Sequence, residues 1–540
     1  MSIRWTYWKR VVAGAMFGVY MAHLLYFLNP QIDISPARLA LVTLLYGVIC
    51  GLIFGSALWG LRILRVRLFG KPEPYRAHGF GFVVLAVFVS AAIYWIHWDT
   101  MRIYLPVNAF RVLSKATNLI TLVAFALLVL WIVERNADRT LSRAIFIAGL
   151  VLIAVSSFSL YQRRESYRVE RRNVVIANIG TVAEKRPVIF IAVRSLPYDW
   201  LITMTGEGRL PFFESVSRTS YFARLEPFPA SHWRALWASL ATGKLPSRHG
   251  VTGRFSYRTP LSGNDPEERF LLLPSGVGFR AWGLLPPVQR ISAKLPSGDS
   301  LPVWSMFERV GVESSVVHWP STAGTPRRAT DGASLAPDMA SRFASTGNAR
   351  NEIVTALATD LAAIKNASAA EADLVVLALE GLSTAQRALG IDNQLPERSS
   401  MRGEAIRTYI DQLDRALGEL ARAHPDHLVV ICSPSAVIPP ELAASAYAIA
   451  VREINPPDPG ADDGFVALIG RATEARPNPA TAYVADVVPT ILFAAGLPVG
   501  RDIDGRIITE AFGDEFLRRT TLSAIQTYEA EQVVVRRRGA

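Results

Sequence analysis

Cysteine is almost absent from this chain of 540 residues. The two that occur are Cys50, inside an apolar run, and Cys432, inside a short hydrophobic run far along the chain. Neither has a plausible partner, so a disulfide framework is excluded and the redox compartment cannot be read from the cysteines.

The sequence also lacks a Lys/Arg-rich tract interleaved with stacking aromatic residues. The net charge of +11 would otherwise suggest a nucleic-acid partner. Much of the basic charge flanks apolar segments instead, where lysine and arginine fix topology and touch lipid headgroups. We therefore expect no nucleic-acid partner, and we interpret residues 526–540, with the run Arg536–Arg538, as a basic, solvated tail.

Hydrophobic residues make up half of the chain, and they concentrate before residue 160. Each of five apolar stretches there is close to the ~20 residues that a helix needs to cross a bilayer. The sequence therefore predicts an α-helical membrane domain of five transmembrane helices over residues 1–160, with the lipid bilayer as a partner. The stretches are 11–28, 39–61, 79–98, 116–133 and 144–160.

The loops between these stretches indicate an orientation. The amino end and loops 62–76 and 135–143 are basic, whereas loop 29–38 carries a single arginine. The positive-inside bias then places the amino terminus in the cytoplasm, and five crossings place residues 187–540 outside. Arginines that follow the fifth stretch argue the other way, but large domains translocate largely regardless of charge. We predict a bacterial-type inner membrane protein whose residues 187–540 are periplasmic.

After a charged linker at 161–186 the pattern changes to short apolar runs that alternate with longer amphipathic stretches, such as 349–366 and 402–422. The runs Val188–Val193, Leu374–Leu379 and Leu428–Cys432 are typical of buried parallel strands. Alternating strands and helices predict an α/β domain with a mostly parallel sheet between helices. In such sheets, ligands bind at the carboxyl ends of the strands.

Several segments carry a resemblance to a known family. VIFIAVRSLPYDWL (188–201) is similar to a first strand that ends in Asp-Gly in the family, and LWASLATGKLPSRHGVTG (236–253) to the helix and turn after the nucleophile. Most specific is VADVVPTILFAAGLPVGRDIDGRIITEAF (484–512). In this order the segments resemble the type I phosphodiesterase/nucleotide pyrophosphatase branch of the alkaline phosphatase superfamily, a sulfatase-like fold. The resemblance implies an alkaline-phosphatase-like domain over 187–525, with a poorly matching stretch at about 255–298.

The resemblance implies chemistry with two metal ions, held by aspartate and histidine, and a threonine or serine nucleophile at a helix start. In this chain other residue types fill those positions. The first aspartate falls on Arg194, and the nucleophile, aligned without a gap, falls on Trp233. A two-residue shift would instead place Ser231 there. The remaining ligand positions fall on Ser383, Arg387, Pro434 and Ser435.

These replacements predict a domain without a metal cofactor or a catalytic residue. We hypothesise that Arg194 and Arg387 lie within about 10 Å of each other and bind an anion, such as a phosphate-bearing lipid, because guanidinium forks fit phosphate oxygens. The alternative is that both arginines turn to solvent or pair with acids such as Asp199 or Glu380.

The leading functional hypothesis is a catalytically inactive, membrane-anchored pseudoenzyme that acts as a binding, scaffold or accessory subunit in an envelope or membrane-protein complex. Its layout resembles that of lipoteichoic acid synthases and phosphoethanolamine transferases. The alternative is a phosphodiesterase/sulfatase-like hydrolase or phospho-group transferase that uses Ser231 in an atypical site. A redox or proton-handling function has no Cys-x-x-Cys-His motif or paired intramembrane acids to support it.

Overall fold

The structure is a computed structural model, and it divides into two compact units. Unit 1 comprises Met1–Arg171 and Phe255–Ser292, and unit 2 comprises Arg172–Arg254 and Ala293–Ala540. The structure describes residues 36–70, 79–100, 107–135, 139–163, 176–179, 186–228, 233–251, 255–258, 269–270, 289–292, 300–319, 334–391, 394–435, 463–529 and 532–535, together with parts of a helical stretch between 7 and 22.

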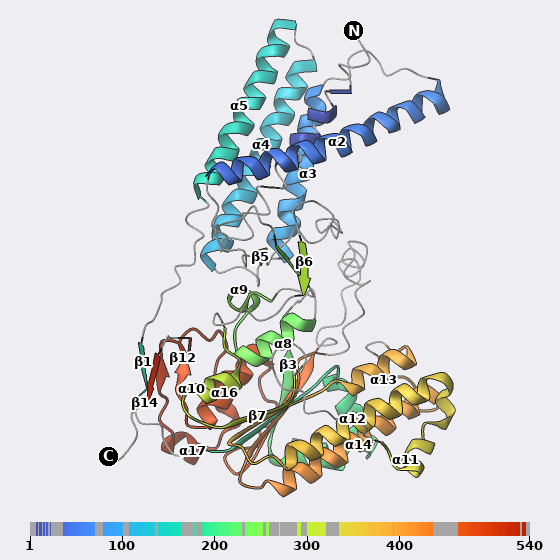
Figure 1. Cartoon of the computed structure of the whole chain (residues 1–540), viewed down its shortest axis with the longest axis vertical. Helices are drawn as coiled ribbons and strands as arrows, with labels where there is room; N and C mark the ends of the chain where they lie inside the picture. The colour runs from blue at the N-terminus through green and yellow to red at the C-terminus, as the bar shows by residue number, and fades with distance from the viewer. Residues whose placement is uncertain are drawn as a thin grey trace. The chain divides into compact units, whose positions relative to one another are not determined.

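Helices dominate unit 1. They are α2 (Pro36–Phe69), α3 (Gly79–Thr100), α4 (Val107–Arg135) and α5 (Arg139–Arg163). Tryptophans of α3 bond to hydroxyls of α4: Trp95 Nε1 donates to Thr121 Oγ1 at 3.0 Å, and Trp98 Nε1 donates to Ser114 Oγ at 2.7 Å. These bonds join two apolar helices that run side by side (Figure 1).

Two stretches within the described helices, Leu39–Leu68 and Phe110–Glu134, are long and apolar enough to cross a membrane by length and composition. The other expected crossings at 79–98 and 144–160 form helices, and the expected crossing at 11–28 lies partly outside the described residues. Five transmembrane helices therefore stay a prediction.

Unit 1 also contains a small antiparallel sheet in the order β5-β4-β6. Its strands are β4 (Phe255–Arg258), β5 (Arg269–Phe270) and β6 (Gln289–Ser292). They lie within the stretch that resembles the family poorly, 255–298. In the sequence, this segment separates the two parts of unit 2, but it belongs to unit 1 with the helices.

A seven-stranded sheet forms the centre of unit 2, in the order β11-β3-β10-β9-β2-β8-β7. The strands β9, β2, β8 and β7 pair in parallel, β3 and β11 also pair in parallel, and β10 is antiparallel to both of its neighbours. The predicted mostly parallel sheet is therefore confirmed. The strands are β2 (Val188–Val193), β3 (Tyr221–Glu226), β7 (Ser314–His318), β8 (Leu374–Leu379), β9 (Leu428–Ser433), β10 (Gly464–Ile469) and β11 (Ala482–Tyr483).

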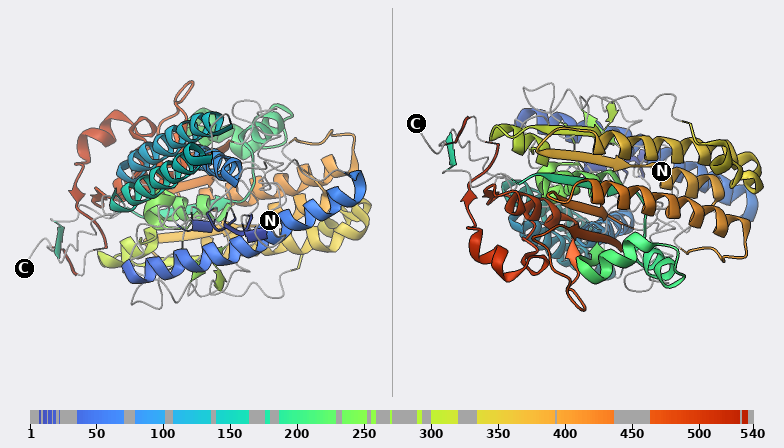
Figure 2. Two further views of the ribbon diagram at one scale, coloured as in Figure 1. Left: turned by 90° about the horizontal axis from the view of Figure 1, so that it is seen from above. Right: turned by 90° about the horizontal axis from the view of Figure 1, so that it is seen from below.

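Helices cover both faces of this sheet. One layer contains α8 (Trp233–Thr242), α10 (Val303–Arg309) and α16 (Val487–Ala494), and the other contains α6 (Tyr198–Gly206), α7 (Pro211–Thr219), α12 (Arg350–Ser368), α13 (Gly381–Leu389) and α14 (Met401–Ala423). Figure 1 shows the two layers on opposite faces, and Figure 2 shows α12 and α14 running side by side.

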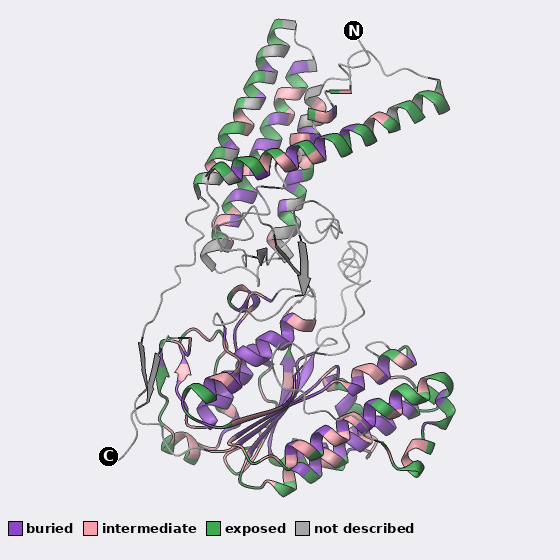
Figure 3. Ribbon diagram, viewed as in Figure 1, coloured by how far each residue is buried: buried purple, intermediate pink, exposed green. Residues whose placement is uncertain are grey.

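Burial on two faces explains why the central strands are almost continuously apolar. In β2, Phe190 belongs to the core under the first layer, whereas Ile189 and Ile191 belong to the core under the second. All six residues of β2 are buried, as are those of its neighbours β8 and β9, and Figure 3 shows buried residues along the centre of the sheet. Strands that are buried on both faces need apolar side chains in both directions.

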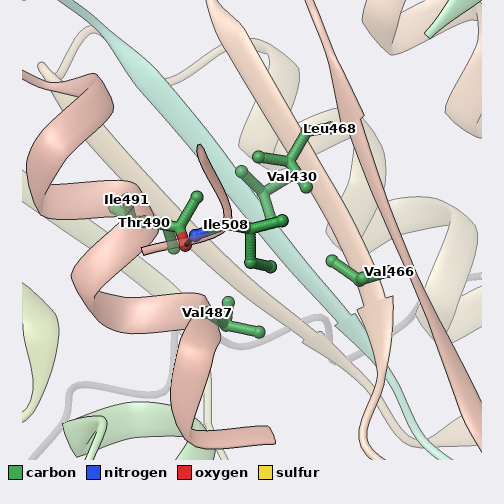
Figure 4. Close-up of a pocket in the computed structure, with 7 residues that line it drawn as sticks. All are labelled: Val430, Val466, Leu468, Val487, Thr490, Ile491 and Ile508. Carbon is green, nitrogen blue, oxygen red and sulfur yellow. Dashed lines mark hydrogen bonds between the residues drawn. The ribbon is translucent and has the colours of Figure 1, made fainter. Parts of the chain in front are cut away.

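The first core is closely packed. Seven residues line a crevice between the sheet and α16 that leaves no room for a water molecule (Figure 4). They are Val430, Val466, Leu468, Val487, Thr490, Ile491 and Ile508. The buried hydroxyl of Thr490 makes two hydrogen bonds: it donates to Asp486 O at 2.7 Å and accepts from Ile508 N at 2.9 Å.

Smaller elements complete unit 2. They are α9 (Pro246–His249), α11 (Pro337–Ser341), α17 (Asp514–Arg519), the 3₁₀ helices Ala344–Ala349, Val484–Asp486 and Thr509–Ala511, and two two-stranded sheets, β1 (Ile176–Ile179) with β14 (Gln532–Val535) and β12 (Val499–Gly500) with β13 (Ala524–Ile525). The pairing of β1 with β14 joins the linker at 161–186 to the basic tail at 526–540.

Candidate functional site

The candidate site lies where the parallel strands β2 and β8 end. In the register of these neighbours Val193 lies opposite Leu379, and Arg194 N donates to Leu379 O at 2.9 Å. The next residues along the two strands, Arg194 and Glu380, therefore emerge together at the carboxyl edge of the sheet. Parallel sheets bind ligands at this edge.

Arg194 makes two specific contacts there. Its Nη1 lies 3.0 Å from Glu380 Oε1, with both side chains about one-quarter exposed, and its guanidinium lies 3.8 Å from the centre of the Trp233 ring. A guanidinium over an indole face is attracted by the ring quadrupole. The carboxylate and the ring thus hold one cation at a position where the family resemblance implies an aspartate.

Two more arginines contribute to the charge at this edge. Burial lowers the pKa of Arg194 from its ordinary value, Glu380 opposes that effect, and the positive charges of Arg387 and Arg234 lower the pKa further. Arg234, which follows Trp233 at the start of α8, has its guanidinium 5.6 Å from the centre of the same indole ring. The structure therefore brings three guanidiniums into electrostatic range, and the sequence had singled out only two of them.

The backbone turns sharply after Arg194. Ser195 has a φ of 62°, which an L-amino acid with a side chain rarely adopts. Its carbonyl accepts a 2.7 Å bond from Nε2 of the buried Gln386. In the family a glycine takes this place, and glycine adopts such a φ without strain. Here a serine adopts this φ at some cost in backbone strain.

The contact between Gln386 and Ser195 also fixes α13 beside the end of β2. Arg387 comes next on this helix; it is exposed, and its Nη2 donates to Thr384 Oγ1 at 3.2 Å. Ser383, one helical turn before Arg387, is half-buried. Arg194 and Arg387 thus each adjoin one residue of the contact between Ser195 and Gln386. Their approach to within about 10 Å stays a prediction.

The start of α13 requires a glycine at position 381. A Cβ at Gly381 would lie 2.6 Å from Ala356 O and 2.6 Å from Asp360 Oδ2, so only glycine fits. Asp360 accepts from Gly381 N at 3.1 Å and from Tyr409 Oη at 2.8 Å. Burial raises the pKa of Asp360 to about 7. Gly381 is therefore needed for packing, independently of any metal.

The side chain at the end of β9 bonds to backbone groups. Ser433 Oγ accepts from Leu196 N at 3.0 Å and donates to Ser435 O at 3.0 Å. Pro434 and Ser435 are buried. These bonds tie the end of β9 to the segment that follows β2, and Ser433, Pro434 and Ser435 offer no carboxylate or imidazole. Ser231, the alternative nucleophile, lies outside the described residues.

The described histidines of unit 2 have other roles. His249 is buried; its Nε2 lies 2.9 Å from Ser239 Oγ and its Nδ1 accepts from Val251 N at 3.0 Å. Burial lowers its pKa to about 3, so it stays neutral. The rings of His424 and His427 are 4.8 Å apart, before the amino end of β9. His318 Nδ1, at the end of β7, lies 3.2 Å from Ala378 O.

These residues do not fit the two-metal centre that the resemblance implies. Metal ions need clustered carboxylate, imidazole or thiolate ligands. Within the part of the chain that the structure describes, no three His, Cys, Asp or Glu side chains gather to hold a metal. A guanidinium at position 194 is itself a cation and cannot donate a lone pair.

Residues 188–433 match the family model of type I phosphodiesterases and nucleotide pyrophosphatases. The match confirms the family resemblance for this part of the chain. A search of curated proteins gave no match.

Solved structures to which the chain is similar include three with these descriptions. Murine ectonucleotide pyrophosphatase/phosphodiesterase 5, inactive and in complex with AMP, is 10% identical, with a TM-score of 0.36 over 58% of this chain and 96% of that one. The wild-type alkaline phosphatase PafA is 9% identical, with a TM-score of 0.40 over 61% and 100%. A protein in the alkaline phosphatase superfamily from Vibrio parahaemolyticus is 11% identical, with a TM-score of 0.35 over 62% and 72%.

Proposed function

We propose that this chain is a membrane-anchored, phosphodiesterase-like protein that binds at its former catalytic edge but does not hydrolyse esters there. It serves as a binding, scaffold or accessory subunit in an envelope or membrane-protein complex. The apolar helices of unit 1 anchor it, with the amino terminus in the cytoplasm and residues 187–540 on the periplasmic side of a bacterial-type inner membrane.

The arrangement of Arg194 is the observation that carries this proposal. Its guanidinium is held between Glu380 at 3.0 Å and the Trp233 ring at 3.8 Å. Two-metal hydrolysis depends on dications that clamp the attacking and leaving oxygens. A fixed guanidinium supplies positive charge, but it cannot lower the pKa of a bound water or hydroxyl as a metal does.

The position of Trp233 also supports the absence of turnover. An indole has no nucleophilic oxygen, and here its face is covered by the guanidinium. Trp233 in turn packs edge-on against Trp237, with ring centres 6.5 Å apart. The start of α8 thus provides an aromatic platform rather than a reactive hydroxyl.

A test combines metal analysis with turnover. The full-length chain, purified in detergent without chelators, should contain no stoichiometric zinc or manganese. It should also hydrolyse bis-p-nitrophenyl phosphate and p-nitrophenyl sulfate no faster than a Ser231→Ala variant, with or without added metal. One or two ions per chain, together with turnover that Ser231→Ala abolishes, would establish the alternative, a hydrolase or transferase with an atypical site.

A further inference from the structure

We propose that the carboxyl edge of the unit 2 sheet is a metal-independent site for a phosphate or sulfate group, formed by Arg194 and Arg234, which lie over the Trp233 ring, together with Arg387 of α13. This inference deepens the proposed function, on which it rests, because it names the class of ligand that the inactive domain would bind. The ligand is an anion with tetrahedral oxygens, presented either by a lipid headgroup or by a soluble ester.

The first argument is that Arg194 is oriented before any ligand arrives. Packing on Trp233 and the bond from Nη1 to Glu380 fix the plane of its guanidinium. Among the described residues, Glu380 is the hydrogen-bond partner of that side chain, so other N–H groups of the fork are left for an oxygen ligand. A planar fork held in place loses little conformational entropy when it binds.

The second argument is charge. Within the part of the chain that the structure describes, the charges with the largest effect on Arg194 are those of Glu380, Arg387 and Arg234. Like charges gathered at a partly buried edge disfavour one another, and a bound anion relieves that repulsion. Charge-assisted bonds from arginine to phosphate oxygens are also among the stronger hydrogen bonds in proteins.

The third argument is that neighbouring acids have other partners. Arg224 Nη2 lies 2.6 Å from Asp199 Oδ1, and Arg224 Nη1 lies 3.6 Å from Asp463 Oδ2. These pairs leave Glu380 as the carboxylate that contacts Arg194.

The experiment uses the full-length chain in phosphatidylcholine nanodiscs, titrated with inorganic phosphate and then with sulfate by calorimetry at low ionic strength. Arg387→Glu should weaken binding of both anions at least about tenfold, because it replaces a donor with a repelling charge. Arg387 is exposed and bonds only to Thr384 among the described residues, so the variant should fold.

The matched control is Arg471→Glu. Its side chain is 80% exposed, and it follows the end of the antiparallel strand β10, at the opposite edge of the same sheet. This variant makes the same change in net charge and should bind as the wild type does. Arg194→Lys tests the fork, because it keeps the charge but loses the planar stack, and it should also weaken binding.

Nanodiscs that contain phosphatidylglycerol distinguish the two sources of the anion. If the headgroup occupies the site, the apparent affinity for free phosphate falls in these nanodiscs, and Arg387→Glu removes that competition. If the affinity is unchanged, the ligand is a soluble ester. The inference is wrong if the wild type binds neither anion, or if Arg387→Glu and Arg471→Glu behave alike. The proposed absence of hydrolysis and metal would stand in either case, because separate measurements test it.

Discussion

The guanidinium of Arg194 lies 3.8 Å from the centre of the Trp233 ring. Arg194, at the end of β2, takes the position at which the family resemblance implies a metal-binding aspartate. Trp233, at the start of α8, takes the position of the nucleophile when the family is aligned without a gap. The two residues suit each other, because a cation and an aromatic face attract each other.

Removing Arg194 should destabilise unit 2. Arg194→Ala leaves Glu380 without its partner and uncovers the indole, which together cost about 1–3 kcal/mol. We expect the thermal unfolding temperature of the full-length chain in detergent to fall by a few degrees. Arg194→Lys should lower the unfolding temperature by less, because it keeps the positive charge beside Glu380.

Arg218→Ala provides the control for this measurement. Arg218 pairs with Glu214 on α7, but its side chain is 73% exposed. Exposed pairs contribute little to stability, so this variant should unfold at nearly the wild-type temperature. Equal effects of Arg194→Ala and Arg218→Ala would show that the stack on Trp233 contributes nothing measurable.

Ser195→Gly should stabilise the protein. The left-handed backbone at Ser195, with φ 62°, costs a residue with a side chain roughly 1–2 kcal/mol. Glycine removes this cost and loses about 0.5–1 kcal/mol through the entropy of the unfolded chain, so the net gain should be small but positive. Ser195→Ala keeps the Cβ and should give no gain. An unfolding temperature that is lower in Ser195→Gly than in Ser195→Ala would contradict the strain argument.

The sequence predicted a mostly parallel sheet in unit 2 and three of its strands, β2, β8 and β9, but not β3, β7, β10 or β11. Apolar runs such as Val188–Val193 can be satisfied only by burial on two faces, and the helices 350–368 and 401–423 follow the predicted amphipathic stretches closely. Periodicity and turn chemistry are local signals, which explains why these elements could be predicted without contacts.

The contacts at the site could not be predicted in the same way. Whether Arg194 would pair with Glu380, bind Trp233 or turn to solvent depends on side-chain geometry after folding, and the sequence left these alternatives open. Arg234 was missed because no family position marks it, although it adjoins Trp233 in the sequence. The β4–β5–β6 sheet was missed because its strands are two to four residues long, too short for a periodic pattern to mark them.

The pH dependence of the free energy of unfolding should show that the buried His249 is neutral in the folded chain. Its pKa is about 3 in the folded chain and near 6.5 when exposed, so below pH 6.5 the unfolded state takes up a proton that the folded state does not. The contribution of His249 to the free energy of unfolding is therefore fully present above pH 6.5, and it falls by about 1.4 kcal/mol for each pH unit below that. Relative to His249→Gln, the wild type should lose roughly 2 kcal/mol between pH 6.5 and 5.

Asp360 provides a control of opposite sign. Its pKa is raised to about 7, so its folded state holds a proton that the unfolded state releases, and that stability is lost as the pH rises toward 7. Asp360→Asn should therefore make the loss on acidification steeper than in the wild type, whereas His249→Gln should make it shallower. Parallel pH profiles for the wild type and His249→Gln would mean that His249 is not neutral in the folded chain.

The membrane orientation is open to a direct test. Loops 62–76 and 135–143 are basic, and moving such loops across a bilayer is disfavoured, so they should stay in the cytoplasm. Protease added to intact spheroplasts should degrade the 187–540 portion, followed through a tag at the carboxyl terminus, and should spare a tag in loop 62–76. In inverted vesicles the pattern should be reversed. Protection of the 187–540 portion in spheroplasts, with digestion of loop 62–76, would place unit 2 in the cytoplasm. The charge bias of the loops would then be outweighed by the arginines that follow α5, between Arg163 and Arg172.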